Sequence, residues 1–372
     1  MLDSIVGILE VAIPFLVVLT LLVFVHELGH YWVARRNGVK VEVFSVGFGP
    51  ELFGWTSKAG TRWRVSALPL GGYVKMLGDM DATSRPDDES LRGLTDAQRQ
   101  EAFPAKSLRA KAAIVAAGPL ANFAFAWFLL AMLFIFVGRS VTPALVTEVM
   151  PDSAAAAAGL QAGDLVTEAN GRSIDRFEEL QRVVQLNLDQ PLSLVIERDG
   201  QERTLTAHPT VLIEEDSNGC EIQLTRLGVR GTLRETEHLG PFEGLWAAAT
   251  ETWSLARDTL IGVGQIIVGT RTTDELGGPI RIAEMSGQVA QIGFVSLILF
   301  TALLSVNLGL INLFPIPMLD GGHLLFYAYE AVRGRPLGPR AQDVGFKLGL
   351  GLVLSLMVFA TINDLLRINA CG

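Results

Sequence analysis

The motif His26-Glu27-Leu28-Gly29-His30 places three ionisable side chains at the end of an apolar run. Residues 26 and 30 lie one helical turn apart, so both imidazoles leave the same face of a helix. This spacing suits two ligands of one zinc ion, and the Glu27 carboxylate could carry a proton from a water to a leaving amine. Ionisable groups are costly within lipid, so we interpret the motif as a hydrolytic metal site. A proton relay or a structural histidine pair is the alternative.

A catalytic zinc site needs a third protein ligand and an open fourth position. The best candidate is Asp320, which follows two prolines and precedes two glycines. The first and third apolar segments of the chain would cross a membrane in the same direction. The ends that carry His26, His30 and Asp320 therefore lie on one side. His323 is a rival ligand, and the Asp-Gly pair alone would suit an ordinary turn.

Composition places these residues in a membrane protein that also has a soluble part. The 372 residues are 49% hydrophobic and 19% charged. Lys and Arg residues flank the connections 35–111 and 315–344, which therefore face the inside, with both termini outside. Four apolar segments are long enough to cross about 30 Å of hydrocarbon; they cover residues 9–34, 112–137, 292–314 and 345–367.

Two extended segments and a polar stretch surround the first two apolar segments. Residues 39–78 alternate partly with period two and predict a β-hairpin close to the membrane. A hairpin has free edges to which an extended substrate could add as a strand. Residues 79–100 are polar and predict an inside loop.

The region after the second apolar segment predicts a small acidic α/β module. Residues 139–239 hold seventeen Asp and Glu against nine Lys and Arg. Strands are expected in "ALVTEVM" and "DLVTEAN", a capped helix ending at Gly159, a second helix in "RFEELQRVVQLN", and a hairpin with an Asp-Gly turn over 192–208. The segment 209–239, with "RLGVRG", would complete this module. Residues 240–268 are amphipathic and contain Trp, which predicts an interfacial helix.

Other protein classes fit the sequence poorly. The two cysteines, Cys220 and Cys371, cannot form a disulfide framework and lack zinc-knuckle spacing. We find no basic patch with interleaved aromatic residues, so nucleic acid is not expected as a partner. The N-terminus lacks the basic region of a cleavable signal peptide.

Six motifs occur in an order that resembles one protein family across nearly the whole chain. They are "HELGH" at 26–30, "GFGP" at 47–50, "PLGGYVKM" at 69–76, "AAGPLANF" at 116–123, "GGPIRIA" at 277–283 and "NLFPIPMLDGGH" at 312–323. The sequence thereby resembles the site-2 intramembrane zinc metalloproteases, peptidase family M50, and especially the bacterial members that regulate sigma-E signalling.

The resemblance implies a role for several residues. By it, His26, His30 and Asp320 are the Zn²⁺ ligands and Glu27 is the catalytic base. Asn312 and Pro315 would help to hold the substrate near the metal. Asn122 and Gly47 are two further candidate substrate-binding residues; a lone amide such as that of Asn122 needs a partner in lipid. The soluble module resembles a bacterial PDZ domain, which would bind a peptide or a free C-terminus. Many relatives have two such domains in tandem, and this chain has room for one clear copy.

The predicted architecture is a multi-pass α-helical membrane protein with four transmembrane helices, a membrane-associated β-hairpin and one inserted α/β PDZ domain. Its parts are a first membrane half, a PDZ-like domain, an amphipathic linker and a second membrane half; they cover residues 1–137, 138–239, 240–290 and 291–372. The expected location is the bacterial inner membrane. Both termini and the PDZ domain would be periplasmic, and the active site would lie near the cytoplasmic face.

The predicted function is regulated intramembrane proteolysis by a zinc metalloendopeptidase. The resemblance implies single-pass membrane substrates such as anti-sigma factors, and also remnant signal peptides. The lipid bilayer is a further partner. A catalytically silent membrane adaptor that uses its PDZ domain is the alternative, against which the intact Glu27 argues. A zinc or proton transporter would need polar residues spread along several membrane segments, whereas here they cluster.

Overall fold

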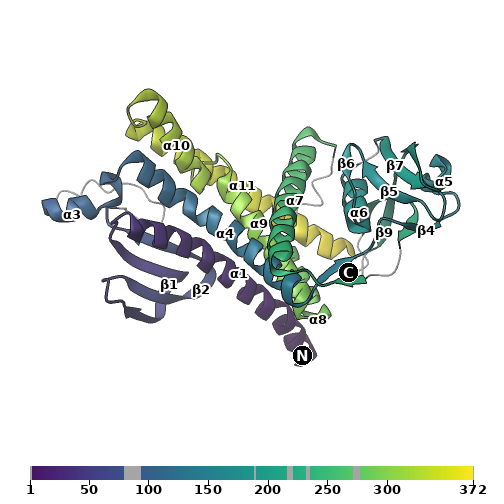
Figure 1. Ribbon diagram of the computed structural model, residues 1–372. Helices are drawn as coiled ribbons and strands as arrows, with labels where there is room; N and C mark the ends of the chain where they lie inside the picture. Colours follow the sequence, from purple (N-terminus) through teal and green to yellow (C-terminus); the bar gives the residue numbers. More distant parts are fainter. Residues whose placement is uncertain are drawn as a thin grey trace. The chain divides into compact units, whose positions relative to one another are not determined.

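A computed structural model describes residues 2–78, 94–187, 190–215, 221–231, 235–270 and 277–371 (Figure 1). The chain divides into two compact units. The first unit is Met1–Leu130 with Gly277–Thr361, and the second is Ala131–Leu276 with Ile362–Gly372. The second unit is thus largely an insertion into the first. The four-part division at residues 137, 239 and 290 stays a prediction, and Cys220 lies outside the described residues.

Four helices among the described residues are long and apolar enough to cross a membrane. Each contains one of the predicted apolar segments or coincides with it to within two residues at either end, which confirms those segments. The first and fourth helices extend beyond their apolar runs at both ends, and the second at its start, because polar residues at a membrane boundary can continue the helical hydrogen bonding. These helices are α1 (Leu2–Arg36), α4 (Leu108–Phe136), α9 (Phe294–Leu313) and α11 (Pro339–Cys371).

Shorter helices flank the apolar ones in the first unit. Helix α8 (Pro279–Ile292) packs along α1, with Gly287 against Val11. Helix α10 (Asp320–Arg333) follows α9, and its Glu330 forms an ion pair of 3.6 Å with Lys111 of α4. The chain from α9 to α10 turns back within a few residues. This turn brings Asp320 into the first unit.

The predicted inside loop 79–100 is wrong over its last part. Residues 79–93 lie outside the described residues, but Asp96–Glu101 form helix α3, followed by a 3₁₀ turn η1 at Phe103–Ala105. The backbone N–H of Gln98 donates to the Thr95 hydroxyl, and the Gln98 side chain accepts from the Thr95 N–H. Such a capping box stabilises the start of a helix. The short polar sequence of α3 has no apolar periodicity from which this helix could be predicted.

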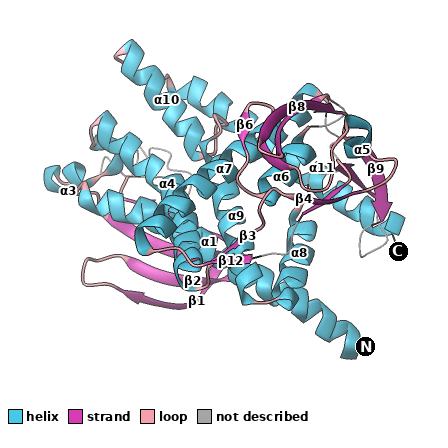
Figure 2. Ribbon diagram, turned by 45° about the vertical axis from the view of Figure 1, so that its right-hand side comes forward, coloured by secondary structure: helices cyan, strands magenta, loops and turns pink. Residues whose placement is uncertain are grey.

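The predicted β-hairpin is confirmed. Strands β1 (Val41–Thr56) and β2 (Arg62–Met76) pair antiparallel and lie alongside α1 (Figure 2). Phe44 is fully buried and stacks on Trp63 with 4.2 Å between ring centroids, which fixes the base of the hairpin against α1. Toward the turn, the side chains of Leu52, Phe53 and Trp55 are exposed.

The second unit is built around a four-stranded antiparallel sheet with the order β6-β5-β7-β8. Its strands are β5 (Leu165–Ala169), β6 (Arg172–Ser173), β7 (Leu192–Arg198) and β8 (Gln201–Ala207). Helices α5 (Ala154–Ala158) and α6 (Phe177–Leu186) pack on it. The centre of this core is fully or nearly fully buried; it includes Val166, Leu180, Leu192, Leu194 and Ile196.

Three strand pairs complete the second unit. β4 (Val146–Val149) pairs with β11 (Val229–Gly231), so the "RLGVRG" segment joins the module as predicted. β9 (Thr210–Glu215) and β10 (Glu221–Arg226) form a hairpin of their own. β3 (Arg139–Val141) pairs with β12 (Glu235–Glu237).

The helix end and the hairpin turn that were predicted from glycine positions in this module are confirmed. Helix α5 ends at Gly159, whose φ is 80°, and the Asp199-Gly200 turn joins β7 to β8. A long helix, α7 (Pro241–Val268), follows β12 and covers the predicted amphipathic segment.

Candidate metal centre

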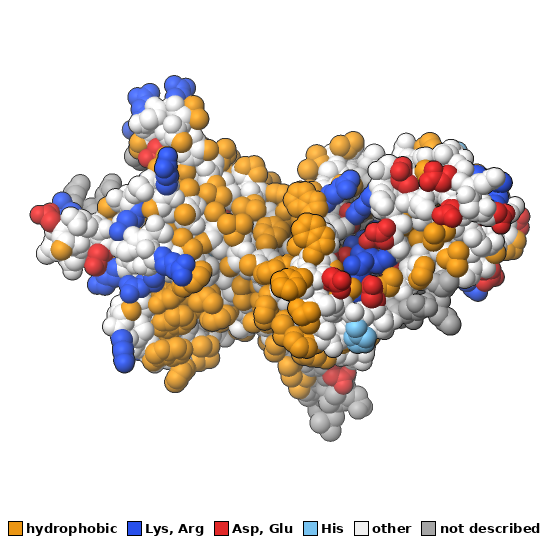
Figure 3. Space-filling view, in the orientation of Figure 1, with side chains coloured by type: hydrophobic (Ala, Val, Ile, Leu, Met, Phe, Trp, Pro, Cys, Tyr) orange, Lys and Arg blue, Asp and Glu red, His pale blue; other side chains and the backbone are white. Residues whose placement is uncertain are grey.

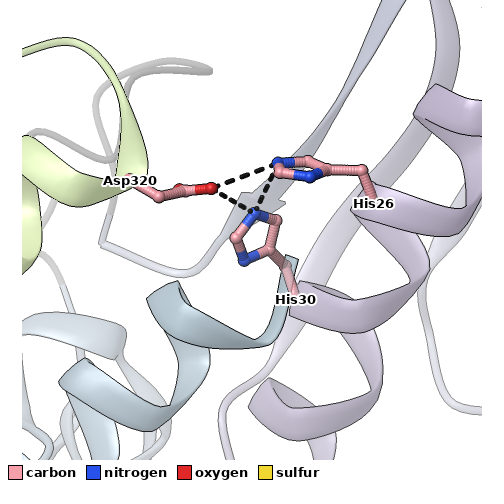
Figure 4. A group of neighbouring side chains, drawn as sticks. All are labelled: His26, His30 and Asp320. Carbon is pink, nitrogen blue, oxygen red and sulfur yellow. Dashed lines mark hydrogen bonds and ion pairs between the residues drawn. The ribbon is translucent and has the colours of Figure 1, made fainter. Parts of the chain in front are cut away.

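Three side chains from distant parts of the sequence meet in the first unit. His26 Nε2 lies 3.2 Å from His30 Nε2 and 3.2 Å from Asp320 Oδ2, and His30 Nε2 lies 3.5 Å from the same oxygen (Figure 4). All three side chains are largely buried, with exposed fractions of 11%, 12% and 16%. Two nitrogens and one oxygen thus form a nearly equilateral triangle.

Secondary structure explains how the three groups meet. His26 and His30 project from one face of α1 because they are one turn apart. Asp320 is the first residue of α10, directly after the turn that follows α9. In this turn Met318 has a φ of 94°, a conformation that costs a residue with a side chain about 1–3 kcal/mol. The packed turn holds the strained residue two positions before Asp320.

The donor set fits a zinc ion. Ligand atoms bound tetrahedrally to zinc at about 2.0–2.2 Å are about 3.3–3.5 Å apart, which matches the observed triangle. The Asp320 Oδ2 atom is buried and has no hydrogen bond of good geometry, despite its short distances to the two rings. A buried carboxylate oxygen without a hydrogen bond is costly. A cation between the three atoms would satisfy it.

Two groups of helix α4 orient the imidazole rings by contacting the Nδ1 atoms, on the side of each ring away from the triangle. His30 Nδ1–H donates to the carbonyl of Ile114 at 2.9 Å, which leaves the Nε2 lone pair directed at the triangle. The amide of Asn122 lies 3.3 Å from His26 Nδ1, and its Oδ1 is buried without a partner. The oxygen and nitrogen of an Asn amide are assigned from the hydrogen bonds they make. If the Asn122 amide is rotated by 180°, its Oδ1 accepts a hydrogen bond from the Nδ1–H of His26. Each ring can then present Nε2 to a metal.

Glu27 lies beside the triangle but not in it. Its carboxylate accepts a hydrogen bond from the backbone N–H of Val74 on β2, and it is close enough to interact electrostatically with both histidines and Asp320. Gly72, also on β2, faces its side chain. The hairpin therefore holds a carboxylate next to the candidate ligands.

The other predicted site residues lie at several places. Asn312 donates its amide N–H to the carbonyl of Leu308 in its own helix at 2.9 Å. Pro315 is exposed in the turn between α9 and α10. Gly47 lies in β1 with φ 88°, and its carbonyl accepts from the Ser45 hydroxyl. Their predicted role in substrate binding stays a prediction.

The rival ligand His323 is not part of the triangle. Its ring lies against Phe326 and Phe346, with centroid distances of 6.5 and 5.3 Å. The described residues whose ligand atoms lie within 4.8 Å of one another are His26, His30 and Asp320.

Sequence reasoning missed three contributors to the site. They are the Ile114 carbonyl, the Val74 N–H and Ser305, whose hydroxyl donates to the Asn122 carbonyl at 2.8 Å and ties α9 to α4. The first two are backbone groups, which no residue type signals. A buried serine within an apolar helix was the available signal for the third, because such a hydroxyl needs a partner.

These features define a membrane protein with two histidines and a carboxylate arranged to bind a metal and a glutamate beside them. Comparison of the sequence with known proteins gives the family. The chain belongs to peptidase family M50, whose sequence profile matches residues 14–356.

Relatives match over nearly their full length. A protein of Rhizobium meliloti that carries the provisional name zinc metalloprotease is 46% identical over 363 residues, covering 96% of this chain and 97% of the relative. One of Agrobacterium fabrum with the same provisional name is 44% identical over 358 residues, 95% of each chain. Metalloprotease MmpA of Caulobacter vibrioides is 37% identical over 385 residues, 97% of each chain.

Proposed function

We propose that this protein is a zinc-dependent endopeptidase that cuts single-pass membrane proteins within or next to their membrane segment. The observation that carries the proposal is the triangle of His26, His30 and Asp320 at the ends of apolar helices, with Glu27 beside it. Membership of peptidase family M50 supports a protease, and the names of the relatives support zinc.

His26, His30 and Asp320 would hold the ion. When bound, zinc supplies the Lewis acidity that activates water and polarises a peptide carbonyl. Glu27 would accept a proton from the attacking water and donate it to the leaving amine. The Val74 N–H orients the Glu27 carboxylate for this transfer. The Ile114 carbonyl and the Asn122 amide keep the two imidazoles in the tautomer that leaves Nε2 free.

The β1–β2 hairpin would hold the substrate in an extended form. A transmembrane helix hides its peptide bonds in internal hydrogen bonds, so it must be locally unwound before it is cut. The hairpin is a two-stranded sheet, and β2 lies against the helix that carries Glu27. Addition of the unwound segment to an edge of this sheet would satisfy its backbone groups next to the candidate metal centre.

We further propose that the site lies near the cytoplasmic face of a bacterial inner membrane. Basic residues gather at the end of the first unit that carries the site, around α3, α10 and the start of α4 (Figure 3). They include Arg35, Arg36, Lys111 and Arg333. Basic residues mark the cytoplasmic side of a membrane helix. Both termini and the second unit would then be periplasmic.

The second unit would bind a peptide in the manner of a PDZ domain. A groove of about 340 Å³ lies between α6 and the chain next to β11; its lining includes Phe177, Leu180, Gln181, Val184, Leu227 and Val229. β11 pairs with β4 along one edge. An extended peptide or a free C-terminus could add along its other edge, with an apolar side chain in the groove. Membrane anti-sigma factors trimmed by another protease, and remnant signal peptides, are the proposed substrates.

The test compares the native chain with Glu27→Gln in lipid nanodiscs. Candidate single-pass substrates of both classes are added, the products are identified by mass spectrometry, and the zinc content of each protein is measured. Glu10→Gln is the matched control, because Glu10 lies on the same helix but is exposed and far from the site.

We expect the native chain and the control to cut, and Glu27→Gln to retain zinc while losing at least about 10²-fold in rate. Zinc binding without cleavage of any substrate by the native chain would favour the silent adaptor. Failure of the native chain to bind zinc would overturn the ligand assignment.

A further inference from the structure

One face of helix α4 points at the candidate metal centre. Ile114, Gly118 and Asn122 all contact the histidine rings of the triangle. They are spaced by four residues, which keeps them on one side of the helix. Lys111 lies three residues before Ile114 and therefore belongs to the same face. The face that orients the two imidazoles thus also carries a cation, one turn farther along.

Lys111 reaches from α4 to α10, the helix that begins with Asp320. Its Nζ atom lies 3.6 Å from Glu330 Oε2 and 5.3 Å from the centroid of the Tyr327 ring. The side chains of Lys111 and Glu330 are only 16% and 24% exposed. An ion pair in open water contributes little because solvent screens it. This pair is largely withdrawn from solvent and is joined by an aromatic face, so it is a fixed link between the two helices.

The side of α10 that meets Lys111 is the side that carries the candidate ligand. Asp320, Leu324 and Tyr327 are spaced by four and three residues, so their side chains leave one face of the helix. Leu324 and Tyr327 pack against a buried cluster that α4 helps to form. Glu330 follows Tyr327 by one turn. The contact face therefore runs from the candidate ligand at one end of α10 to the ion pair near the other end.

The first turn of α10 is held closely, but by residues without side chains. A Cβ at Gly321 would overlap the carbonyl oxygen of Phe314, and a Cβ at Gly322 would overlap that of Ile316. The turn after α9 therefore sets where α10 begins. A helix held at one end can still tilt about that end, so its direction needs a second point of attachment.

The length of α10 makes this second point effective. Asp320 and Glu330 are separated by about 15 Å along the helix axis. A preorganised site tolerates errors of about 10–20° in the orientation of its groups, and a tilt of about 10° moves the Glu330 end by only about 3 Å. Losing the contact with Lys111 would allow a movement of this size. The Asp320 carboxylate would then leave its place beside the two imidazoles.

We propose that Lys111 is a positioning residue for the candidate metal centre. By holding the far end of α10 against α4, it keeps the Asp320 carboxylate at its corner of the triangle, while the same face of α4 orients both imidazoles. Helix α4 is then the common reference for all three candidate ligands. The inference rests on the proposed metal-binding function of the triangle, and Lys111 acts through α10 rather than on the reacting atoms.

The test measures metal binding by the full-length protein in lipid nanodiscs. Lys111→Met removes the charge and keeps an unbranched side chain, whereas Lys111→Arg keeps the cation. The double variant Lys111→Glu/Glu330→Lys exchanges the two charges. Lys347→Met is the matched control, because Lys347 forms an ion pair of 2.7 Å with Asp343 on α11 but is 73% exposed.

Two readouts are recorded for each protein. The dissociation constant for zinc is obtained by competition with a chelator of known affinity. The metal-free protein is also loaded with cobalt, whose visible absorption depends on the geometry of its ligands. Thermal stability is measured in parallel, so that a change in the metal site can be separated from a general loss of stability.

We expect Lys111→Met to weaken zinc binding by about tenfold, the lower end of the loss seen when a group that supports a metal ligand is removed. Its cobalt spectrum should also differ from that of the native chain. Lys111→Arg and the Lys347→Met control should bind zinc like the native chain. The variant with exchanged charges should bind zinc more tightly than Lys111→Met, because the ion pair is restored.

Several results would overturn the proposal. If Lys111→Met lowers thermal stability but leaves the zinc affinity and the cobalt spectrum unchanged, Lys111 only stabilises the fold. An equal loss of zinc in Lys347→Met would show that the effect is not specific to this link. If Lys111→Met does not fold, Glu330→Gln removes the ion pair with Lys111 in place, and unchanged zinc affinity in that variant would be decisive. Absence of zinc from the native chain would instead overturn the ligand assignment itself, and the inference with it.

Discussion

Gly118 of α4 lies against the rings of both His26 and His30, and no space remains for a methyl group between them. A Cβ at Gly118 would fall 2.9 Å from His26 Cε1 and would overlap His30 Nε2. The close approach of α4 is what allows the Ile114 carbonyl and the Asn122 amide to reach the two Nδ1 atoms.

Gly118→Ala should therefore release the metal without unfolding the protein. We expect zinc content to fall severalfold, because the added methyl displaces both rings from the triangle. Gly351→Ala is the matched control, since it adds the same methyl to another membrane helix where a Cβ meets open space. Zinc is measured by mass spectrometry on protein purified in parallel. Equal zinc in the two variants would contradict the tight fit around the rings.

Asn122→Ala should weaken metal binding by about 10–100-fold, the usual cost of losing a group that orients a ligand histidine. The measurement is zinc transfer to a chromogenic chelator. Asn312→Ala serves as control, because that amide bonds to its own helix at the Leu308 carbonyl. If Asn122→Ala keeps zinc but raises KM for substrate, the residue binds substrate and does not orient His26.

The two candidate third ligands can be separated by substitution. Asp320→Asn should lose zinc, because it replaces a carboxylate 3.2 Å from His26 Nε2 by a neutral amide. His323→Ala should keep zinc, since that ring packs on Phe326 and Phe346. Zinc retention by Asp320→Asn together with loss by His323→Ala would reverse the assignment.

Acid should destabilise the module of the second unit through Asp164. This buried carboxylate accepts from Arg198 at 2.5 and 2.7 Å and from the backbone N–H of Gln161 at 2.8 Å. Burial raises its pKa, but the hydrogen bonds from Arg198 and Gln161 lower it by more, so its pKa lies below the usual value. Its stabilising effect is complete above the unfolded-state pKa of about 3.9 and is lost as pH falls through the folded-state pKa.

The measurement for Asp164 is hydrogen exchange over residues 143–187 at a series of pH values, corrected for intrinsic rates. We expect protection to fall below about pH 4 in the native chain and to depend less on pH in Asp164→Asn. Asp152→Asn is the control, because Asp152 is exposed at a turn. A native-like loss of protection in Asp164→Asn would rule out this carboxylate as the cause.

Much of the fold could be predicted because its signals are local. Long apolar runs predicted α1, α4, α9 and α11, and alternation with turn residues predicted the β1–β2 hairpin and the β7–β8 turn at Asp199-Gly200. The pairing of β3 with β12 was not predictable, because its three-residue strands are separated by the whole module. Such short strands have too few residues to show a pattern.

The part of the candidate site that consists of ionisable side chains was predictable, because these residue types are recognisable in the sequence. His26, Glu27 and His30 stand out in an apolar run, and the direction of the membrane segments brought Asp320 to the same side. The groups that orient the rings were harder to find, because the Ile114 carbonyl has no sequence signal. The backbone strain at Met318 was also not predictable, because no feature of the sequence indicates that a methionine adopts a φ of 94°.

The triangle joins α1 to α10, which lie far apart in the sequence, and this order has a consequence for biosynthesis. The ribosome makes His26 and His30 early, but Asp320 emerges only after residues 131–276, the larger part of the second unit, have been made. A growing chain therefore carries two ligands and the neighbouring glutamate, without the third ligand. The protein cannot hold its metal with the full set of side chains until α9 and the start of α10 have been made. The order of the sequence thus delays assembly of the site until the membrane part is nearly complete.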